Sequence, residues 1–254
     1  MNRYFIHLAY NGKNYNGWQI QPNSPSIQET LQKALEVLFR EPVQLTGCGR
    51  TDTGVHARNF YAHFDSKQTS IDSDQKIIFK LNSILPDDIK IYAIHNMLHN
   101  AHARFDANKR TYKYYISKGK EIFFKDLVWQ NSLQLNIELM NKAASLLKNY
   151  SDFTSFSKLH SDTKTNNCNI SEAYWIQQEE RIIFTIKADR FLRNMVRAIV
   201  GTLIDVGKEK ISLEEFCRII EDKNRMKAGT SVPASGLFLE EIQYPYLIPN
   251  KPDS

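Results

Sequence analysis

Cysteine is scarce in this chain. Cys48, Cys168 and Cys217 are three among 254 residues, and they lie far apart without a CxxC pair. An odd number of widely spaced cysteines is not a disulfide framework or a cysteine zinc site. Such residues are typical of reduced thiols in the cytosol, so we expect a cytoplasmic protein.

Long apolar runs and the common nucleotide motifs are missing as well. No stretch approaches the length that spans a bilayer, and the N-terminal residues lack the apolar block of a signal peptide. The sequence has no GxxxxGKS or GxxxxGKT, no GxGxxG after a first strand, no GxSxG and no HExxH. These absences argue against a membrane protein, a nucleotide-dependent enzyme and the usual serine or zinc hydrolases.

The composition is otherwise ordinary for a soluble globular protein. Hydrophobic residues make up 42% and charged residues 24% of the chain, which is long enough for one large domain or two modest ones. The formal net charge of +5 is a mild excess that is compatible with a polyanionic partner but does not require one.

Hydrophobic periodicity predicts the same order of elements in both halves of the chain, with one extra helix before the last strand of the second half. In residues 1–108 the pattern predicts strand 3–10, helix 26–40, strands 43–46 and 59–66, helix 74–85 and strand 89–94. In residues 109–254 it predicts strand 110–117, helix 137–150, strands 170–177 and 181–188, helices 190–206 and 212–222 and strand 236–242. We therefore expect an α+β fold of two ferredoxin-like or RRM-like βαββαβ halves, whose antiparallel sheets flank a central cleft.

The segment 47–57, Gly-Cys-Gly-Arg-Thr-Asp-Thr-Gly-Val-His-Ala, lies between two of these predicted strands. It is too polar and too rich in glycine for a core segment, and too long for a tight hairpin. Loops between rigid strands often display catalytic groups, which makes Asp52 a candidate. The alternative is a turn aspartate that accepts hydrogen bonds from amides of its own loop.

Three arginines share one face of the predicted helix 190–206, since Arg190, Arg193 and Arg197 are spaced i, i+3 and i+7. Arg197 stands among apolar residues, where a charge is costly unless it is paired, and Asp52 is the candidate partner. The alternative is a solvated helix face, which we favour for Arg193.

Aromatic side chains also allow two interpretations. Tyr112 and Tyr114 share a face of strand 110–117, where they either stack on bases or pack in a core. Tyr15 and Trp18 lie in a polar loop, and they either contact a ligand or anchor that loop. A metal site is not supported, because the spaced histidines have no common helix and no acidic cluster nearby: His95, His99 and His102.

Several separate stretches, in one order along nearly the whole chain, agree with a single family: the chain resembles the TruA-type tRNA pseudouridine synthases. The matching stretches are Tyr10-Asn11-Gly12, Gly17-Trp18-Gln19, Gly49 to Ala57, His102-Ala103-Arg104-Phe105, Tyr112-Lys113-Tyr114, Asp152 to Phe156, Met195-Val196-Arg197, Ile199-Val200-Gly201 and Gly236 to Leu239. Asn11, Thr53 and Lys113 depart from it, standing where the family commonly has Asp, Ala and Arg.

The resemblance implies roles for particular residues. Asp52 matches the catalytic carboxylate, and Tyr112 matches the tyrosine that contacts the target base and is a candidate for proton transfer. Arg197 matches the residue that pairs with the catalytic Asp, and Arg50 matches the arginine that fills the space of a flipped base. Further candidate RNA contacts are Lys113, Arg190, Arg193, Trp18 and His56.

The implied activity is the conversion of uridine to pseudouridine in the anticodon arm of tRNA, at positions 38 to 40. It requires cleavage of the C1′–N1 bond and reattachment through C5, with no cofactor and no metal. The resemblance also implies a homodimer with a basic cleft. The alternative is a tRNA-binding relative without catalytic activity.

Overall fold

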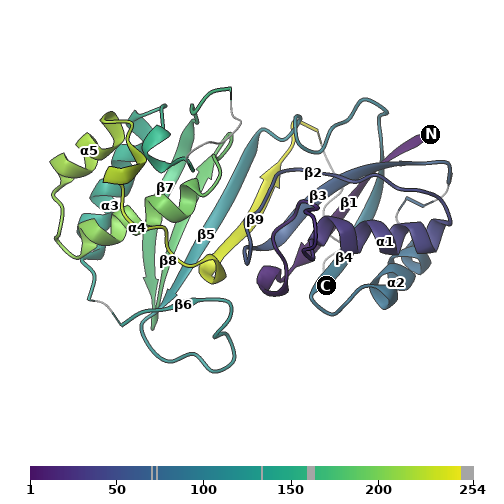
Figure 1. The fold of residues 1–254 in the computed structure, drawn as a ribbon, viewed down its shortest axis with the longest axis horizontal. Helices are drawn as coiled ribbons and strands as arrows, with labels where there is room; N and C mark the ends of the chain where they lie inside the picture. Colours follow the sequence, from purple (N-terminus) through teal and green to yellow (C-terminus); the bar gives the residue numbers. More distant parts are fainter. Residues whose placement is uncertain (70, 73, 133, 159–163, 247–254) are drawn as a thin grey trace. The chain divides into compact units, whose positions relative to one another are not determined.

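The computed structural model of the protein describes residues 1–69, 71–72, 74–132, 134–158 and 164–246. It forms two compact units, one of residues 1–108 with the segment that begins at Leu239, and the other of Lys109–Phe238. Each unit combines β-strands with helices, which confirms the α+β class (Figure 1). Within the described ranges, no helix is long and apolar enough to cross a membrane.

The first unit has the predicted order of elements. These are β1 (Asn2–Tyr10), α1 (Ile27–Phe39), β2 (Thr46–Gly47), β3 (His56–Ser66), α2 (Gln75–Ile84) and β4 (Ile89–Met97). The strands β4, β1 and β3 are neighbours in that order and pair antiparallel, and β9 (Leu237–Gln243) enters this unit from Leu239 on. Helices α1 and α2 pack beside each other (Figure 1).

Of the predicted strand 43–46, only Thr46 belongs to a strand, the two-residue β2. The side chain of Glu36 accepts a hydrogen bond from the Val43 amide at 3.3 Å, and Gln28 donates one to the Leu45 carbonyl at 2.8 Å. Both Val43 and Leu45 are buried, as a strand pattern predicts. Their backbone groups bond to side chains of α1, so periodicity found the burial but not the hydrogen-bond partners.

The second unit contains the remaining elements. These are β5 (Lys109–Ser117), β6 (Trp129–Gln130), α3 (Ile137–Leu146), β7 (Ile170–Gln178), β8 (Arg181–Ala188), α4 (Met195–Gly207) and α5 (Leu213–Glu221). The strands β5, β8 and β7 are neighbours in that order and pair antiparallel, while β6 pairs parallel with β5. Helix α3 packs on β7 and on α4.

Helix α4 begins at Met195, five residues later than predicted. Asn194 precedes it with φ +65°, in the left-handed region, which a continuous helix cannot contain. Before it, the Arg190 amide donates to the side chain of Asp189 at 2.7 Å. Arg190 and Arg193 therefore precede the helix, and the predicted helical stripe that joins them to Arg197 is wrong.

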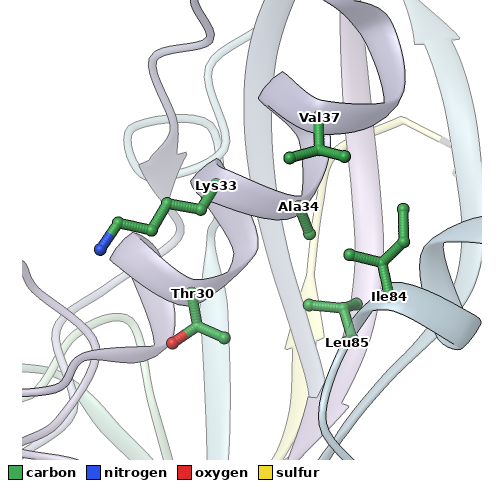
Figure 2. Close-up of a pocket in the computed structure, with 6 residues that line it drawn as sticks. All are labelled: Thr30, Lys33, Ala34, Val37, Ile84 and Leu85. Carbon is green, nitrogen blue, oxygen red and sulfur yellow. The ribbon is translucent and has the colours of Figure 1, made fainter.

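A pocket of about 240 Å³ lies where α1 meets the end of α2 (Figure 2). Its lining residues are Thr30, Lys33, Ala34, Val37, Ile84 and Leu85. This lining is mostly aliphatic and includes no carboxylate or imidazole, and its one charged group, Lys33, is paired with Glu29 at 2.5 Å.

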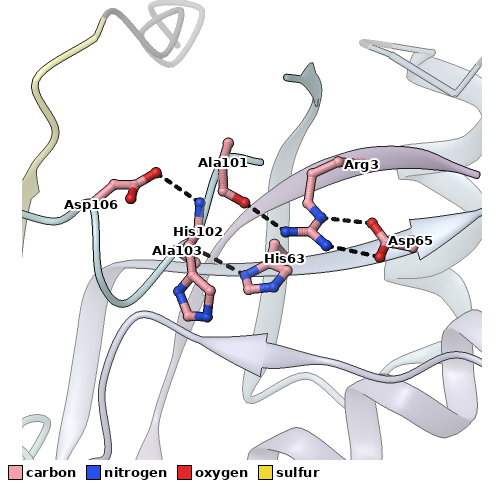
Figure 3. Close-up of polar contacts among 7 residues, drawn as sticks. All are labelled: Arg3, His63, Asp65, Ala101, His102, Ala103 and Asp106. Atoms are coloured by element: carbon pink, nitrogen blue, oxygen red, sulfur yellow. Dashed lines mark hydrogen bonds and ion pairs between the residues drawn. The ribbon is translucent and has the colours of Figure 1, made fainter. Parts of the chain in front are cut away.

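His63 belongs to a cluster of polar side chains on the first unit (Figure 3). Its Nδ1 accepts a hydrogen bond from the Ala103 amide at 3.1 Å, and the ring is only 7% exposed. The neighbouring Arg3 guanidinium binds Asp65 at 2.6 and 2.8 Å. Burial, together with the charges of Arg3 and His102, lowers the pKa of His63 to about 4.

The free energy of unfolding should decrease as the pH falls from about 6.5 to about 4. The unfolded chain binds a proton at His63 in this range, whereas the folded protein keeps the ring neutral as an acceptor for Ala103. The stabilisation is therefore complete above pH 6.5 and is lost toward pH 4, by at most about 1.4 kcal/mol per pH unit. Urea unfolding at a series of pH values measures this slope.

The matched variant is His63→Asn, whose amide oxygen offers Ala103 an acceptor that does not titrate. Its stability should depend less on pH between 6.5 and 4 than that of the natural protein. Equal slopes for the two proteins would contradict the assignment to His63.

Candidate functional site

Asp52 lies in the loop between β2 and β3, half-buried between the buried Thr51 and the exposed Thr53. The loop closes on itself there, since the Val55 amide donates to the Asp52 carbonyl at 3.1 Å. Gly54, within that closure, has φ +77°, a conformation that favours glycine. The carboxylate is therefore attached to a tight turn with defined backbone geometry.

A second loop, residues 11–18, packs against the Asp52 loop and is called the supporting loop below. The Trp18 amide donates to the Thr51 carbonyl and the Gly54 amide donates to the Tyr15 carbonyl, each at 3.3 Å. The Tyr10 hydroxyl bonds to the Thr51 hydroxyl at 2.9 Å. These bonds fix the backbone on both sides of Asp52.

Gly17 is the point of closest approach between the two loops. It has φ +87°, and a Cβ placed on it would lie 2.2 Å from the Thr51 carbonyl oxygen. A side chain is excluded there by contact and by backbone conformation alike. The supporting loop can lie against the Asp52 loop only because this residue has no side chain.

Trp18 and His56 support the loop from its buried side. Trp18 is 3% exposed and stacks on Phe60 with ring centroids 4.1 Å apart. His56 is 1% exposed, and its Nδ1 accepts from the Gly12 amide at 3.1 Å. Neither side chain offers a surface to RNA, so the prediction that Trp18 and His56 contact RNA is wrong. Of the two interpretations of Trp18, the one in which it anchors the loop holds.

Asp88 secures the supporting loop, a role that the sequence did not reveal. Its carboxylate accepts from the Tyr15 hydroxyl at 2.6 Å and from the Asn14 side chain (Nδ2) at 3.2 Å, and its carbonyl accepts from the Asn11 backbone amide at 2.8 Å. Burial, reinforced by the bond to Asp88, raises the pKa of Tyr15, so the hydroxyl stays protonated as a donor. Because Asp88 is distant in sequence, no local pattern links it to this loop.

Arg50 is exposed, two residues before Asp52 on the same loop. The first unit therefore carries one cation and one carboxylate two residues apart, on a loop whose backbone is hydrogen-bonded to residues 11–18. The backbone positions both of them.

In the second unit, Tyr112 and Tyr114, which share a face of β5, have different environments. Tyr114 is fully buried and its hydroxyl donates to the Pro233 carbonyl at 2.8 Å, so it belongs to the core. Tyr112 is half-buried, and its ring meets the edge of Phe191 at 5.2 Å between centroids. Only Tyr112 of the pair retains surface for a ligand; Lys113, also half-buried, points to the opposite face of the strand.

Arg197 lies in the first turn of α4 and is half-buried. Its Nε donates to the Val232 carbonyl at 2.7 Å, and the Val232 amide donates back to the Arg197 carbonyl at 3.2 Å. This reciprocal pair fixes the guanidinium. Arg193 is exposed and Arg190 half-buried, both ahead of the helix.

The predicted residues thus fall into two groups. Asp52 and Arg50 share the loop of the first unit, and Tyr112, Lys113, Arg190, Arg193 and Arg197 belong to the second. The predicted pairing of Asp52 with Arg197 would join the two units and stays a prediction. Among the described residues, no group of three or more His, Cys, Asp or Glu side chains could hold a metal ion.

Comparison with known proteins places the chain among enzymes that modify tRNA. A family model described as tRNA pseudouridine synthase matches residues 143–245. Proteins named tRNA pseudouridine synthase A are similar over nearly the full length. The one from Parabacteroides distasonis is 52% identical, with 96% of this chain and 97% of that protein covered. The one from Azobacteroides pseudotrichonymphae is 55% identical (96% and 98% covered), and that from Clostridium acetobutylicum 40% identical (93% and 97%).

Replacing Gly17 with alanine should destabilise the protein by about 1–3 kcal/mol, because the new Cβ must displace the Thr51 carbonyl. The matched control is Gly49→Ala on the same loop, where a Cβ would have no neighbour within 4 Å. Urea unfolding should separate the two variants. A Gly17→Ala protein as stable as Gly49→Ala would show that the two loops are not in tight contact.

Proposed function

This chain belongs to the tRNA pseudouridine synthase A family, and on that premise we propose that it converts uridine to pseudouridine in the anticodon stem-loop of tRNA, at positions 38 to 40. The similarity to its relatives spans nearly the full length of both chains. The observation that carries the proposal is that Asp52 lies on a loop whose backbone is fixed by hydrogen bonds to Tyr10, Tyr15 and Trp18.

The reaction is an isomerisation with simple chemical requirements. The C1′–N1 bond breaks, the base turns, and a C1′–C5 bond forms while C5 loses a proton and N1 gains one. A carboxylate near C1′ serves as nucleophile or electrostatic partner, and a second group moves the proton. Atoms and electrons balance without an oxidant or a phosphate donor.

Asp52 is the carboxylate that we assign to C1′. Its backbone is fixed by the bonds that Thr51 and Gly54 make to the supporting loop. A side chain on such a segment reaches its reactive position with little further loss of conformational entropy. Arg50, which is exposed two residues before Asp52, is the side chain that we assign to the space left in the base stack when the target nucleotide flips out.

Tyr112 and Arg197 complete the proposed set. The half-buried ring of Tyr112, which makes a T-shaped contact with Phe191, is assigned to the target base, and its hydroxyl is the candidate for proton transfer. Arg197 is fixed through Nε on Val232, and a guanidinium has further N–H donors for the Asp52 carboxylate. Loss of either residue should impair catalysis more than folding.

We assign the binding of the tRNA backbone phosphates to exposed or half-buried cationic side chains. Lys113, Arg190 and Arg193 are the candidates, and the net charge of +5 favours a polyanion. The affinity should therefore fall as salt rises.

The finer architecture remains a proposal. We propose that residues 1–108 and 109–254 form ferredoxin-like halves flanking a basic cleft, with the Asp52 loop on the first and Tyr112 and Arg197 on the second. The strand orders β4-β1-β3 and β5-β8-β7 support the two halves, although β9 enters the first unit from Leu239 on. We also propose that the protein is a cytoplasmic homodimer, as its resemblance to the family implies.

Asp52→Ala should abolish the reaction, since no other carboxylate is assigned to C1′. Release of tritium from tRNA labelled at C5 of uridine should fall by at least about 10³-fold. Binding of the same tRNA should change by no more than a few-fold. The matched control is Thr53→Ala, an exposed neighbour on the loop, which should keep full activity.

Tritium release by Asp52→Ala at the natural rate would overturn the role of Asp52. If the natural protein binds tRNA but releases no tritium from any anticodon-arm uridine, the chain is instead a tRNA-binding relative without catalytic activity.

A further inference from the structure

The second unit has a concavity of about 710 Å³ beside the start of α4. Its polar lining consists of Lys158, Asn194, Arg225, Thr230 and Ser231. Two of these side chains are cationic, and the lining includes no Asp or Glu. A concavity with this charge favours an anion.

Arg225 is held in a fixed orientation at this concavity. Its Nη1 donates to the carbonyls of Ala228 and Gly229 at 3.3 and 3.2 Å, and its Nη2 donates to the Ser231 hydroxyl at 2.9 Å. A guanidinium anchored in this way loses little side-chain entropy when it binds a ligand.

Ser231 is left with a hydrogen to donate. Its oxygen accepts from Arg225 at 2.9 Å and from the Asn194 side chain at 2.6 Å. A hydroxyl has one donor and two acceptor lone pairs, so two accepted bonds leave the O–H to point at an acceptor. The Asn194 side chain makes this bond and does not cap α4. The N-terminus of α4, which carries a partial positive charge, therefore lies at this concavity.

The floor of the concavity is rigid because it is built on α4. The Gly229 amide donates to the Thr202 hydroxyl at 2.9 Å, and a Cβ on Gly201 would lie 1.9 Å from the Thr230 carbonyl oxygen. The chain thus lies directly on the helix. Val232, two residues after Thr230, is the residue that anchors Arg197.

Two cations, a hydroxyl donor and a helix N-terminus suit a ligand with several acceptor oxygens around one negative charge. A phosphodiester has this character. We propose that the concavity binds a backbone phosphate of the tRNA substrate, contacted by Arg225, Lys158 and the Ser231 hydroxyl. This inference rests on the proposed function, which supplies the polyanion, and it adds a phosphate subsite supported on the segment that anchors Arg197.

The test is equilibrium binding of an unmodified tRNA transcript over a series of salt concentrations. Arg225→Gln and Lys158→Gln should each weaken binding roughly tenfold at about 0.1 M salt and lower the slope of log K against log salt by about 0.7–1. Lys158 is exposed, so its replacement leaves the fold intact even if that of Arg225 does not.

Ser231→Ala separates the hydrogen bond from the charge. It should weaken binding a few-fold without changing the salt slope, because no charge is lost. The matched control is Lys227→Gln, a nearby exposed lysine paired with Asp222 at 2.7 Å and outside the lining, which should leave affinity and slope unchanged.

Salt slopes for Arg225→Gln and Lys158→Gln equal to that of the natural protein would overturn the phosphate subsite. So would a loss for Lys227→Gln as large as theirs, since that outcome indicates a general effect of net charge. Because the test reads binding, it stays decisive even if the natural protein releases no tritium, the result that counts against the proposed function.

Discussion

The close contact between two backbone segments at Gly17 is the constraint on which the candidate site depends. The Thr51 carbonyl lies where a side chain of residue 17 would be, and it accepts a hydrogen bond from the Trp18 amide. Buried carbonyl and amide groups need partners, and here each loop supplies them to the other. This contact fixes the backbone position of Asp52, because Thr51 and Gly54 are hydrogen-bonded to residues 11–18 and cannot move independently of them.

The second unit uses the same principle around α4. Gly201 lets the Thr230 backbone lie on the helix, and the reciprocal bonds between Arg197 and Val232 continue that contact by two residues. In both units a glycine allows backbone to approach backbone, and a candidate site residue, Asp52 or Arg197, belongs to a segment that is held in this way. The residues that hold these segments set the geometry of the candidate site, and its polar side chains are the candidates for the chemistry. Precise positioning of reacting groups requires such rigid support.

Much of this could be read from the sequence. The hydrophobic periods yielded the α+β class and the order of elements, and the motif from Gly49 to Ala57 singled out Asp52 with Arg50 beside it. Such features are local, since they depend on neighbours within one helical turn or one strand. Resemblance to the family added the reaction, because a carboxylate on a polar loop does not by itself name a substrate.

The tertiary structure decided what depends on residues far apart in the chain. It buried His56, tied Tyr15 to Asp88, began α4 at Met195 in place of Arg190, and gave the backbone of Val43 partners on a helix. Each outcome turns on which group meets a given donor or acceptor across long sequence separations. A local pattern records whether a residue is apolar or polar, and it determined the elements; the pairing of polar groups is settled only when those elements pack.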